Sequence, residues 1–118
     1  MTHKDLDVWK QAMQFAQRIY VLTNDFPKTE QFGLVSQMRR AAVSVPSNIA
    51  EGAARQTNKE FIQFLYIALG SLMELETQLI LSVEIGYLSK NDFEQLQEDL
   101  TAEARLLNGF IRYRKGRG

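Results

Sequence analysis

Residues 61–86 read FIQFLYIALGSLMELETQLILSVEIG, and this stretch decides the fold. Two apolar stripes run along it at helical spacing. The first stripe consists of Phe61, Leu65, Ala68, Leu72, Leu75 and Leu79. The second stripe consists of Ile62, Tyr66, Leu69, Met73, Ile80 and Val83. A helix that is apolar over most of its circumference must be buried on more than one side, either beneath neighbouring helices or against another chain.

The residues around this stretch predict where the helix begins and ends. Thr57-Asn58-Lys59-Glu60 is a capping box, in which the threonine and the glutamate satisfy backbone amides of the first turn. Gly86 suits the left-handed turn that follows a helix. Ser89-Lys90-Asn91-Asp92 repeats the cap and predicts a fourth helix. The apolar face of that helix carries Phe93, Leu96, Leu100, Ala104, Leu107 and Ile111.

The same helical spacing predicts two helices before residue 57. The first carries Val8, Ala12, Phe15, Ile19 and Leu22 on one face. It should end near Asn24, because the residue before Pro27 is pushed away from helical angles. The second should begin around Thr29 and end near Gly52.

Pro46 lies within the second predicted helix, whose apolar period continues past it. A proline inside a helix removes one backbone hydrogen bond and crowds a carbonyl, so we expect a kink near residues 44–46. Because the links between helices are short, consecutive helices should be antiparallel. The sequence therefore predicts an all-α, antiparallel up-and-down four-helix bundle with a proline kink in the second helix.

Length and composition indicate the number of domains and the expected location of the protein. With 118 residues, 45% of them hydrophobic, the chain fits a single domain over residues 1–118 with flexible ends at about 1–5 and 114–118. The chain has no cysteine and its polar start does not resemble a secretion signal, so we expect a cytoplasmic protein. Its longest uncharged run, residues 61–73, is shorter than a membrane span, and we expect no membrane association.

The sequence offers no set of residues for catalysis or metal binding. His3 is the only histidine, so zinc sites and histidine-assisted nucleophiles cannot be assembled. Glu74 and Glu76 lie two residues apart and point to different helix faces, which separates them as an acid-base pair. We therefore expect no enzyme, no metal and no cofactor. Arg39 and Arg40 are the natural partners of these carboxylates, and such a pair between helices would fix their register.

Two further groups of residues have more than one interpretation. Gly70-Ser71 lies inside a predicted helix and favours close helix packing over a phosphate-binding loop. From Arg105 to the end there are five bases and no acid. The candidate nucleic-acid-binding residues of this tail are Arg112, Tyr113, Arg114, Lys115 and Arg117. The alternative is a solubilising end that complements the negative end of the fourth helix.

Two long blocks carry a family resemblance. Residues 39–52, RRAAVSVPSNIAEG, and residues 68–79, ALGSLMELETQL, resemble the signature of the 23S rRNA-intervening-sequence proteins, and Asp7-Val8-Trp9-Lys10 fits as well. The resemblance implies a bacterial four-helix bundle. Proteins of this group and the related accessory proteins of diversity-generating retroelements form homopentameric rings, and the retroelement relatives bind nucleic acid and a reverse transcriptase.

The resemblance also implies roles for individual residues, although no catalytic role carries over. The matching positions expected to serve the fold and the assembly are Arg40, Asn48, Glu51, Gly70, Ser71, Glu74 and Glu76. Our first hypothesis is a non-enzymatic homo-oligomer, a pentamer, that binds RNA or another nucleic acid through its basic residues. The alternative is a protein-interaction scaffold that holds a protein partner without touching nucleic acid.

Overall fold

Four α-helices form most of residues 2–117, which are the residues that the computed structural model describes. They are α1 (Asp7–Thr23), α2 (Leu34–Ala53), α3 (Asn58–Glu84) and α4 (Lys90–Lys115). Two short 3-10 turns, His3–Asp5 and Lys28–Glu30, precede α1 and α2. No strand occurs in this part of the chain. The predicted all-helical fold with four helices is confirmed.

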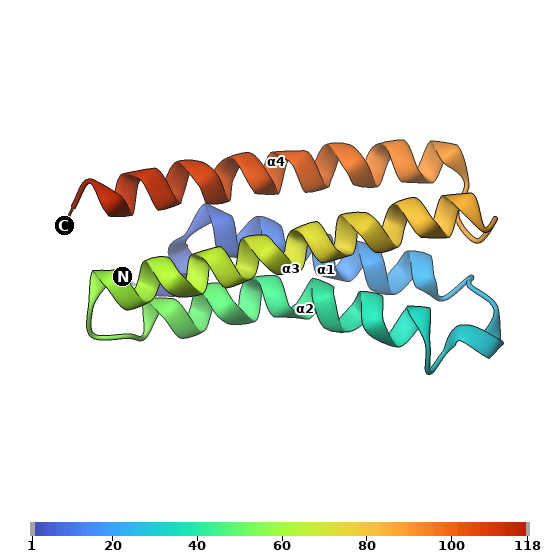
Figure 1. The fold of residues 1–118 in the computed structure, drawn as a ribbon, viewed down its shortest axis with the longest axis horizontal. Coiled ribbons are helices and arrows are strands. Elements are labelled where there is room, and N and C mark those ends of the chain that lie inside the picture. Colours follow the sequence, from blue (N-terminus) through green and yellow to red (C-terminus); the bar gives the residue numbers. More distant parts are fainter. Residues whose placement is uncertain (1, 118) are drawn as a thin grey trace.

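The helices pack in the order in which they occur along the chain. α1 contacts α2 and α4, and α3 contacts α2 and α4, so the four axes lie at the corners of a square. Consecutive helices run in opposite directions along a body of 46 × 24 × 20 Å (Figure 1). The amino terminus, the carboxyl terminus and the turn between α2 and α3 therefore lie at the same end of the bundle (Figure 1).

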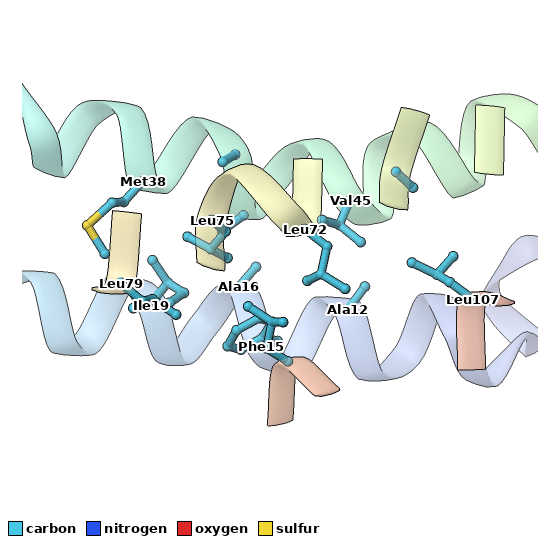
Figure 2. Packing of buried hydrophobic residues seen from close by; sticks show 14 of the residues in the cluster. Ala12, Phe15, Ala16, Ile19, Met38, Val45, Leu72, Leu75, Leu79 and Leu107 are labelled. Carbon is cyan, nitrogen blue, oxygen red and sulfur yellow. The ribbon is translucent and has the colours of Figure 1, made fainter. Parts of the chain in front are cut away.

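The first apolar stripe of α3 forms the centre of the core. Leu65, Leu72, Leu75 and Leu79 are fully buried, and Leu72, Leu75 and Leu79 lie close to side chains of the other helices in Figure 2. The other helices meet this stripe with their own buried faces, which the periodicity predicted. The buried members are Val8, Ala12, Phe15 and Ile19 of α1, Met38, Val45 and Ile49 of α2, and Leu96, Leu100, Leu107 and Ile111 of α4.

The hydroxyl half of each predicted cap forms, whereas the Glu60 carboxylate accepts a bond from the Thr57 hydroxyl at 2.8 Å and not from a backbone amide. The Thr57 hydroxyl accepts a hydrogen bond from the amide of Glu60 at 3.2 Å, and the Ser89 hydroxyl accepts one from the amide of Asp92 at 3.0 Å. Gly86 follows α3 with φ of 84°, an angle that favours glycine. These caps fix the two turns that flank α3 and hence its full length.

The start of the second helix differs from the prediction. Thr29 lies in a 3-10 turn, and α2 begins only at Leu34, after Gly33. Glu30 explains the difference, because one of its carboxylate oxygens accepts a bond from the Leu34 amide at 3.3 Å. The other accepts a bond from the Tyr87 hydroxyl at 2.9 Å and raises the tyrosine pKa. The turn is thus tied to the far end of α3.

Pro46 and the chain ends bear on two further predictions. α2 stays helical through Pro46 and ends at Ala53, one residue beyond the predicted end; the kink itself stays a prediction.

At the carboxyl end, α4 includes residues 114 and 115. Residues 1 and 118 of the expected flexible ends lie outside the described residues. Flexibility at both ends stays a prediction.

Candidate nucleic-acid interface

The basic tail belongs to the last turn of α4 and the two residues that follow it. A helical tail spreads its side chains around the axis, so the five candidate residues do not share one face. Arg112, Tyr113, Lys115 and Arg117 are exposed, whereas Arg114 is half-buried. The basic residues also lie at the negative end of the helix dipole, where they stabilise α4.

Arg114 connects α4 to the start of α3. Its Nε donates a hydrogen bond to Oδ1 of Asn58 at 2.7 Å, and its carbonyl accepts one from Nδ2 of Asn58 at 2.6 Å. Its guanidinium carbon lies 4.8 Å from the centre of the Phe61 ring. Arg114 therefore has a structural role that the sequence did not predict. The N–H groups of its guanidinium other than Nε–H take no part in the bonds to Asn58.

A recess of about 540 Å³ opens beside Arg114. Four segments line it: the residues before α1, the turn between α2 and α3, the first turn of α3, and the end of α4. Phe110 and Tyr113 stack at 6.3 Å between ring centres and supply aromatic surface there. Arg55 from the turn lies at the same recess. The recess thus combines guanidinium groups with aromatic rings, which can hold phosphates and stack bases.

Arg55 is the basic residue of this end that sequence reasoning missed. It pairs with Glu51 at 3.1 Å and rests 4.7 Å from the centre of the Phe64 ring. Both groups of the Arg55–Glu51 pair are largely exposed, so the pair is weak and leaves Arg55 available to an anion. The sequence did place Arg55 in the turn just before the Thr57 cap, and this position could have identified it as a candidate.

The other tail residues lie over aromatic rings. Lys115 Nζ is 5.1 Å from the centre of the Tyr66 ring on α3. Arg117 lies 5.4 Å from the Tyr113 ring centre and donates a bond to the Tyr113 hydroxyl at 2.9 Å. Cation–aromatic contacts hold these side chains in place while their charges stay in solvent. A neutral chain therefore carries a basic surface at one end.

The predicted ion pairs between α2 and α3 do not form within residues 2–117. Arg39 is turned towards α1, where its Nε donates to the Thr23 hydroxyl at 3.0 Å. Glu74 accepts a bond from Gln78, and Glu76 accepts one from Gln97 of α4 at 2.7 Å. The prediction is wrong within one chain, because Arg39 and Glu76 lie on helix faces that look away from each other.

Arg40 is exposed and takes part in no ion pair among the described residues. The two pairs that this part of the chain does form join Arg18 to Asp99 and Arg55 to Glu51. The first of them connects α1 to α4 rather than α2 to α3.

Gly70 and Ser71 have different surroundings. A Cβ added at Gly70 would meet no atom within 4 Å, so the prediction of close packing at this glycine is wrong within one chain. The Ser71 hydroxyl lies 2.8 Å from that of Ser44 on α2. Asn48 Nδ2 donates to the Ser44 carbonyl at 2.8 Å and to its hydroxyl at 2.9 Å. A small polar network therefore joins α2 to α3.

The second apolar stripe of α3 is only partly covered by its own chain, because Ile62, Leu69 and Val83 pack against the core. Tyr66, Met73 and Ile80 expose 45%, 39% and 43% of their surface. By length and composition α3 is also apolar enough to cross a membrane, since an 18-residue window has a mean hydropathy of 1.4. Core helices share this composition, and α3 packs on α2 and α4 with its inner stripe in the core. Exposed apolar surface of this kind is typical of surfaces that bind a partner.

Two residues outside the basic end were not predicted. Glu103 of α4 is 1% exposed and neither carboxylate oxygen has a hydrogen-bond partner. Burial raises its pKa from 4.5 to about 8, because an apolar surrounding disfavours the charged form. Phe32, in the turn before α2, exposes 93% of its surface. Within residues 2–117 no cluster of histidine and carboxylate ligands could hold a metal ion.

The family model described as 23S rRNA-intervening sequence protein matches residues 4–109. The chain belongs to this family. A solved structure from Bacteroides thetaiotaomicron, a protein with unknown function from the S23 ribosomal protein family, is 28% identical in sequence. The likeness covers 89% of this chain and 95% of that chain, with a TM-score of 0.81. A comparison with curated proteins finds no match.

The range matched by the model of the 23S rRNA-intervening sequence protein family includes part of the basic end and excludes the rest. The match ends at residue 109, so residues 112–117 lie beyond the part that the family shares. Arg55 and Asn58, by contrast, fall inside it. The predicted family is therefore confirmed, and the recess is lined by residues inside the matched range together with residues beyond it.

Proposed function

We propose that this protein is a non-enzymatic, cytoplasmic homo-oligomer, a pentamer, that binds RNA through the basic end of its bundle. One observation carries the proposal: Arg55, Tyr113 and Arg114 converge on one recess, although they come from segments far apart in the sequence. Arg112 and Lys115 belong to the last turn of the same helix, α4, and Arg117 follows it. The family name, which refers to 23S rRNA, supports RNA as the polyanion.

Self-association supports the binding of RNA by a chain without net charge. A single basic end neutralises few phosphates. Copies arranged side by side present the same end repeatedly, and the linked contacts raise the overall affinity without new chemistry. The exposed part of the second stripe of α3 supports self-association, since symmetric assembly is the commonest way in which soluble proteins cover apolar surface.

Fluorescence anisotropy with a labelled single-stranded RNA over a salt series tests the proposal. We expect binding that weakens as salt rises, because displaced counterions drive phosphate contacts. The variant Arg112→Gln/Arg117→Gln should bind about tenfold more weakly and show a shallower salt slope. The matched control Lys28→Gln/Lys90→Gln removes the same charge from the opposite end and should leave binding unchanged. No binding at low salt, or equal losses in both variants, would contradict the proposal.

A second candidate function is a scaffold that binds a protein partner. Phe32 favours it, because an almost fully exposed phenylalanine beside Arg39 and Arg40 is a suitable anchor for a partner. A pull-down from the native host after nuclease treatment separates the two candidates. The scaffold predicts a captured protein that Phe32→Ser loses and that Arg112→Gln/Arg117→Gln retains.

A further inference from the structure

The recess at the basic end has the size of a small-molecule site. Its volume is about 540 Å³, and its walls come from the residues before α1, the turn between α2 and α3, the first turn of α3 and the end of α4. Ligand pockets in proteins commonly have volumes of this order. A single nucleotide fits a space of this kind, whereas a base inside a double helix would have to leave its stack to enter it.

Three aromatic rings form a row in the lining of the recess. The ring centres of Phe61 and Phe110 lie 5.6 Å apart in an edge-to-face contact. The rings of Phe110 and Tyr113 are nearly parallel, with 14° between their planes. Phe61 is buried and Phe110 is half-buried, but Tyr113 exposes 56% of its surface. Tyr113 is therefore the ring of this row on which a base can stack.

Guanidinium groups lie over both ends of the aromatic row. Arg114 lies 4.8 Å from the centre of the Phe61 ring, and Arg117 lies 5.4 Å from the centre of the Tyr113 ring. Arg114 is half-buried and bonded to Asn58, so it is fixed in place. Arg117 follows the last residue of α4, is exposed, and donates to the exposed Tyr113 hydroxyl. Because exposed cation–aromatic contacts are weak, a base can displace Arg117 from the Tyr113 ring.

The recess also offers positive charge to a phosphate. Arg55 and Arg114 both line it, although they belong to different segments. The pair between Arg55 and Glu51 is exposed on both sides, so a phosphate can replace the carboxylate at little cost. Guanidinium groups bind phosphate oxygens through paired, charge-assisted hydrogen bonds. One ring face and two guanidinium groups in the same recess match the base and the phosphate of one nucleotide.

We propose that this recess binds one unpaired nucleotide of an RNA, with its base on Tyr113 and its phosphate at Arg55 and Arg114. The inference rests on the RNA binding in the proposed function and names the part of the RNA that is recognised: an unpaired end, loop or bulge. A base in a duplex is stacked on both faces and paired along its edge, so it offers no face to a protein ring. A duplex reaches the outer cations Arg112 and Lys115 and leaves the recess empty.

Three labelled RNA hairpins with equal numbers of phosphates test this site by fluorescence anisotropy. The first ends in a blunt duplex, the second in a short unpaired overhang, and the third in an overhang of the same length made of stable abasic spacers. We expect the unpaired overhang to bind about tenfold more tightly than the blunt hairpin, because stacking of one base contributes about that factor. The abasic overhang keeps the phosphates and should lose most of this gain.

Variants at the ring show whether Tyr113 provides the stacking surface. Tyr113→Ala should weaken binding of the unpaired overhang about tenfold and leave the blunt hairpin unchanged, since a ring is lost without a charge. Tyr113→Phe keeps the ring and should retain the preference. The matched control is Phe32→Ala, which removes a 93% exposed ring from the turn between α1 and α2, at the opposite end of the bundle (Figure 1). It should bind all three hairpins like the wild type.

A variant at Arg55 tests the phosphate side of the recess. Arg55→Gln should weaken binding of the unpaired overhang and lower its salt slope by about one, because one phosphate contact is lost. The blunt hairpin should keep its affinity and its slope. Circular dichroism checks that every variant is folded.

The other outcomes separate the nucleotide site from RNA binding as such. Equal affinity for all three hairpins overturns the nucleotide site, while the proposed RNA binding stands. An abasic overhang that binds as tightly as the intact one means that the recess holds phosphate alone, as it would in a phosphopeptide, and overturns the stacking of a base. Equal losses in Tyr113→Phe and Tyr113→Ala assign the effect to the hydroxyl and overturn it too. Failure of every hairpin to bind at low salt overturns the nucleotide site and the proposed function together.

Discussion

The hydroxyl oxygens of Ser44 and Ser71 lie 2.8 Å apart and join α2 to α3 near the middle of both helices. Apolar ridges can slide past one another by a turn at little cost, but a hydrogen bond between two short side chains fits only one register. Asn48 orients the Ser44 hydroxyl by donating to it at 2.9 Å. The network therefore defines the relative height of the two helices.

Removing one of these hydroxyls should weaken the fold modestly. We expect Ser71→Ala to lower the free energy of unfolding by about 1 kcal/mol, because a half-buried hydrogen bond is lost while Ser44 keeps Asn48 as a partner. Urea denaturation measures the change. Thr77→Ala, which removes an exposed hydroxyl of the same helix, should stay within about 0.5 kcal/mol of the wild type, and an equal loss in both variants would remove the special role of Ser71.

Two glycines on neighbouring helices should respond oppositely to alanine. A Cβ at Gly52 would lie 2.6 Å from Cβ of Phe64 and 2.9 Å from Cδ1 of Phe61, whereas one at Gly70 meets nothing. We expect Gly52→Ala to destabilise the protein by about 1 to 3 kcal/mol through overpacking. Gly70→Ala should stabilise it by up to about 1 kcal/mol through helix propensity. Thermal unfolding followed by circular dichroism checks both signs.

The tail arginines should separate into a structural residue and a binding residue. Arg114→Ala removes a bond to Asn58 and a contact with Phe61, so we expect a loss of about 1 to 2 kcal/mol in unfolding free energy. Arg117→Ala should leave stability within about 0.5 kcal/mol and weaken RNA binding. Urea titration and anisotropy on the same samples measure the two effects. An Arg114→Ala protein as stable as the wild type would contradict the structural role of Arg114.

The sequence predicted the parts of this fold that depend on local chemistry. The stripes of residues 61–86, the hydroxyl bonds of the Thr57 and Ser89 caps and the turn at Gly86 all follow from spacing and side-chain type, and they are confirmed. The late start of α2 depends on Glu30 bonding to Tyr87, which is 57 residues away. A contact of that kind leaves no local pattern, so the first turn of α2 was assigned wrongly.

The candidate site was predicted less completely than the fold. The basic tail was visible as a charge run, but its partners Asn58 and Phe61 belong to the start of another helix. Only the packing of α4 on α3 brings them together. Arg39 was predicted to pair with a carboxylate of α3 for a related reason. Periodicity places a residue on one face of its helix, but it does not say which neighbouring helix covers that face.

Glu103 gives the protein a pH dependence of known sign. Its pKa is about 8 in the folded protein and 4.5 when exposed, so between these values the folded state holds a proton that the unfolded state has lost. Stability is therefore complete below about pH 4.5 and falls as pH rises towards 8, by about 1.4 kcal/mol per pH unit from this group. Urea denaturation at several pH values between 5 and 9 measures this slope.

Glu103→Gln separates this titration from the other carboxylates. The amide has nearly the same size and cannot ionise, so we expect the decline between pH 5 and 8 to flatten and the variant to exceed the wild type in stability at pH 8. Glu98→Gln, an exposed glutamate on the same helix, is the matched control and should keep the wild-type slope. A slope that survives Glu103→Gln would mean that another group causes it. A flat wild-type profile would mean that the carboxyl group finds a partner or water in solution, since only an unsatisfied, desolvated carboxylate has its pKa raised this far.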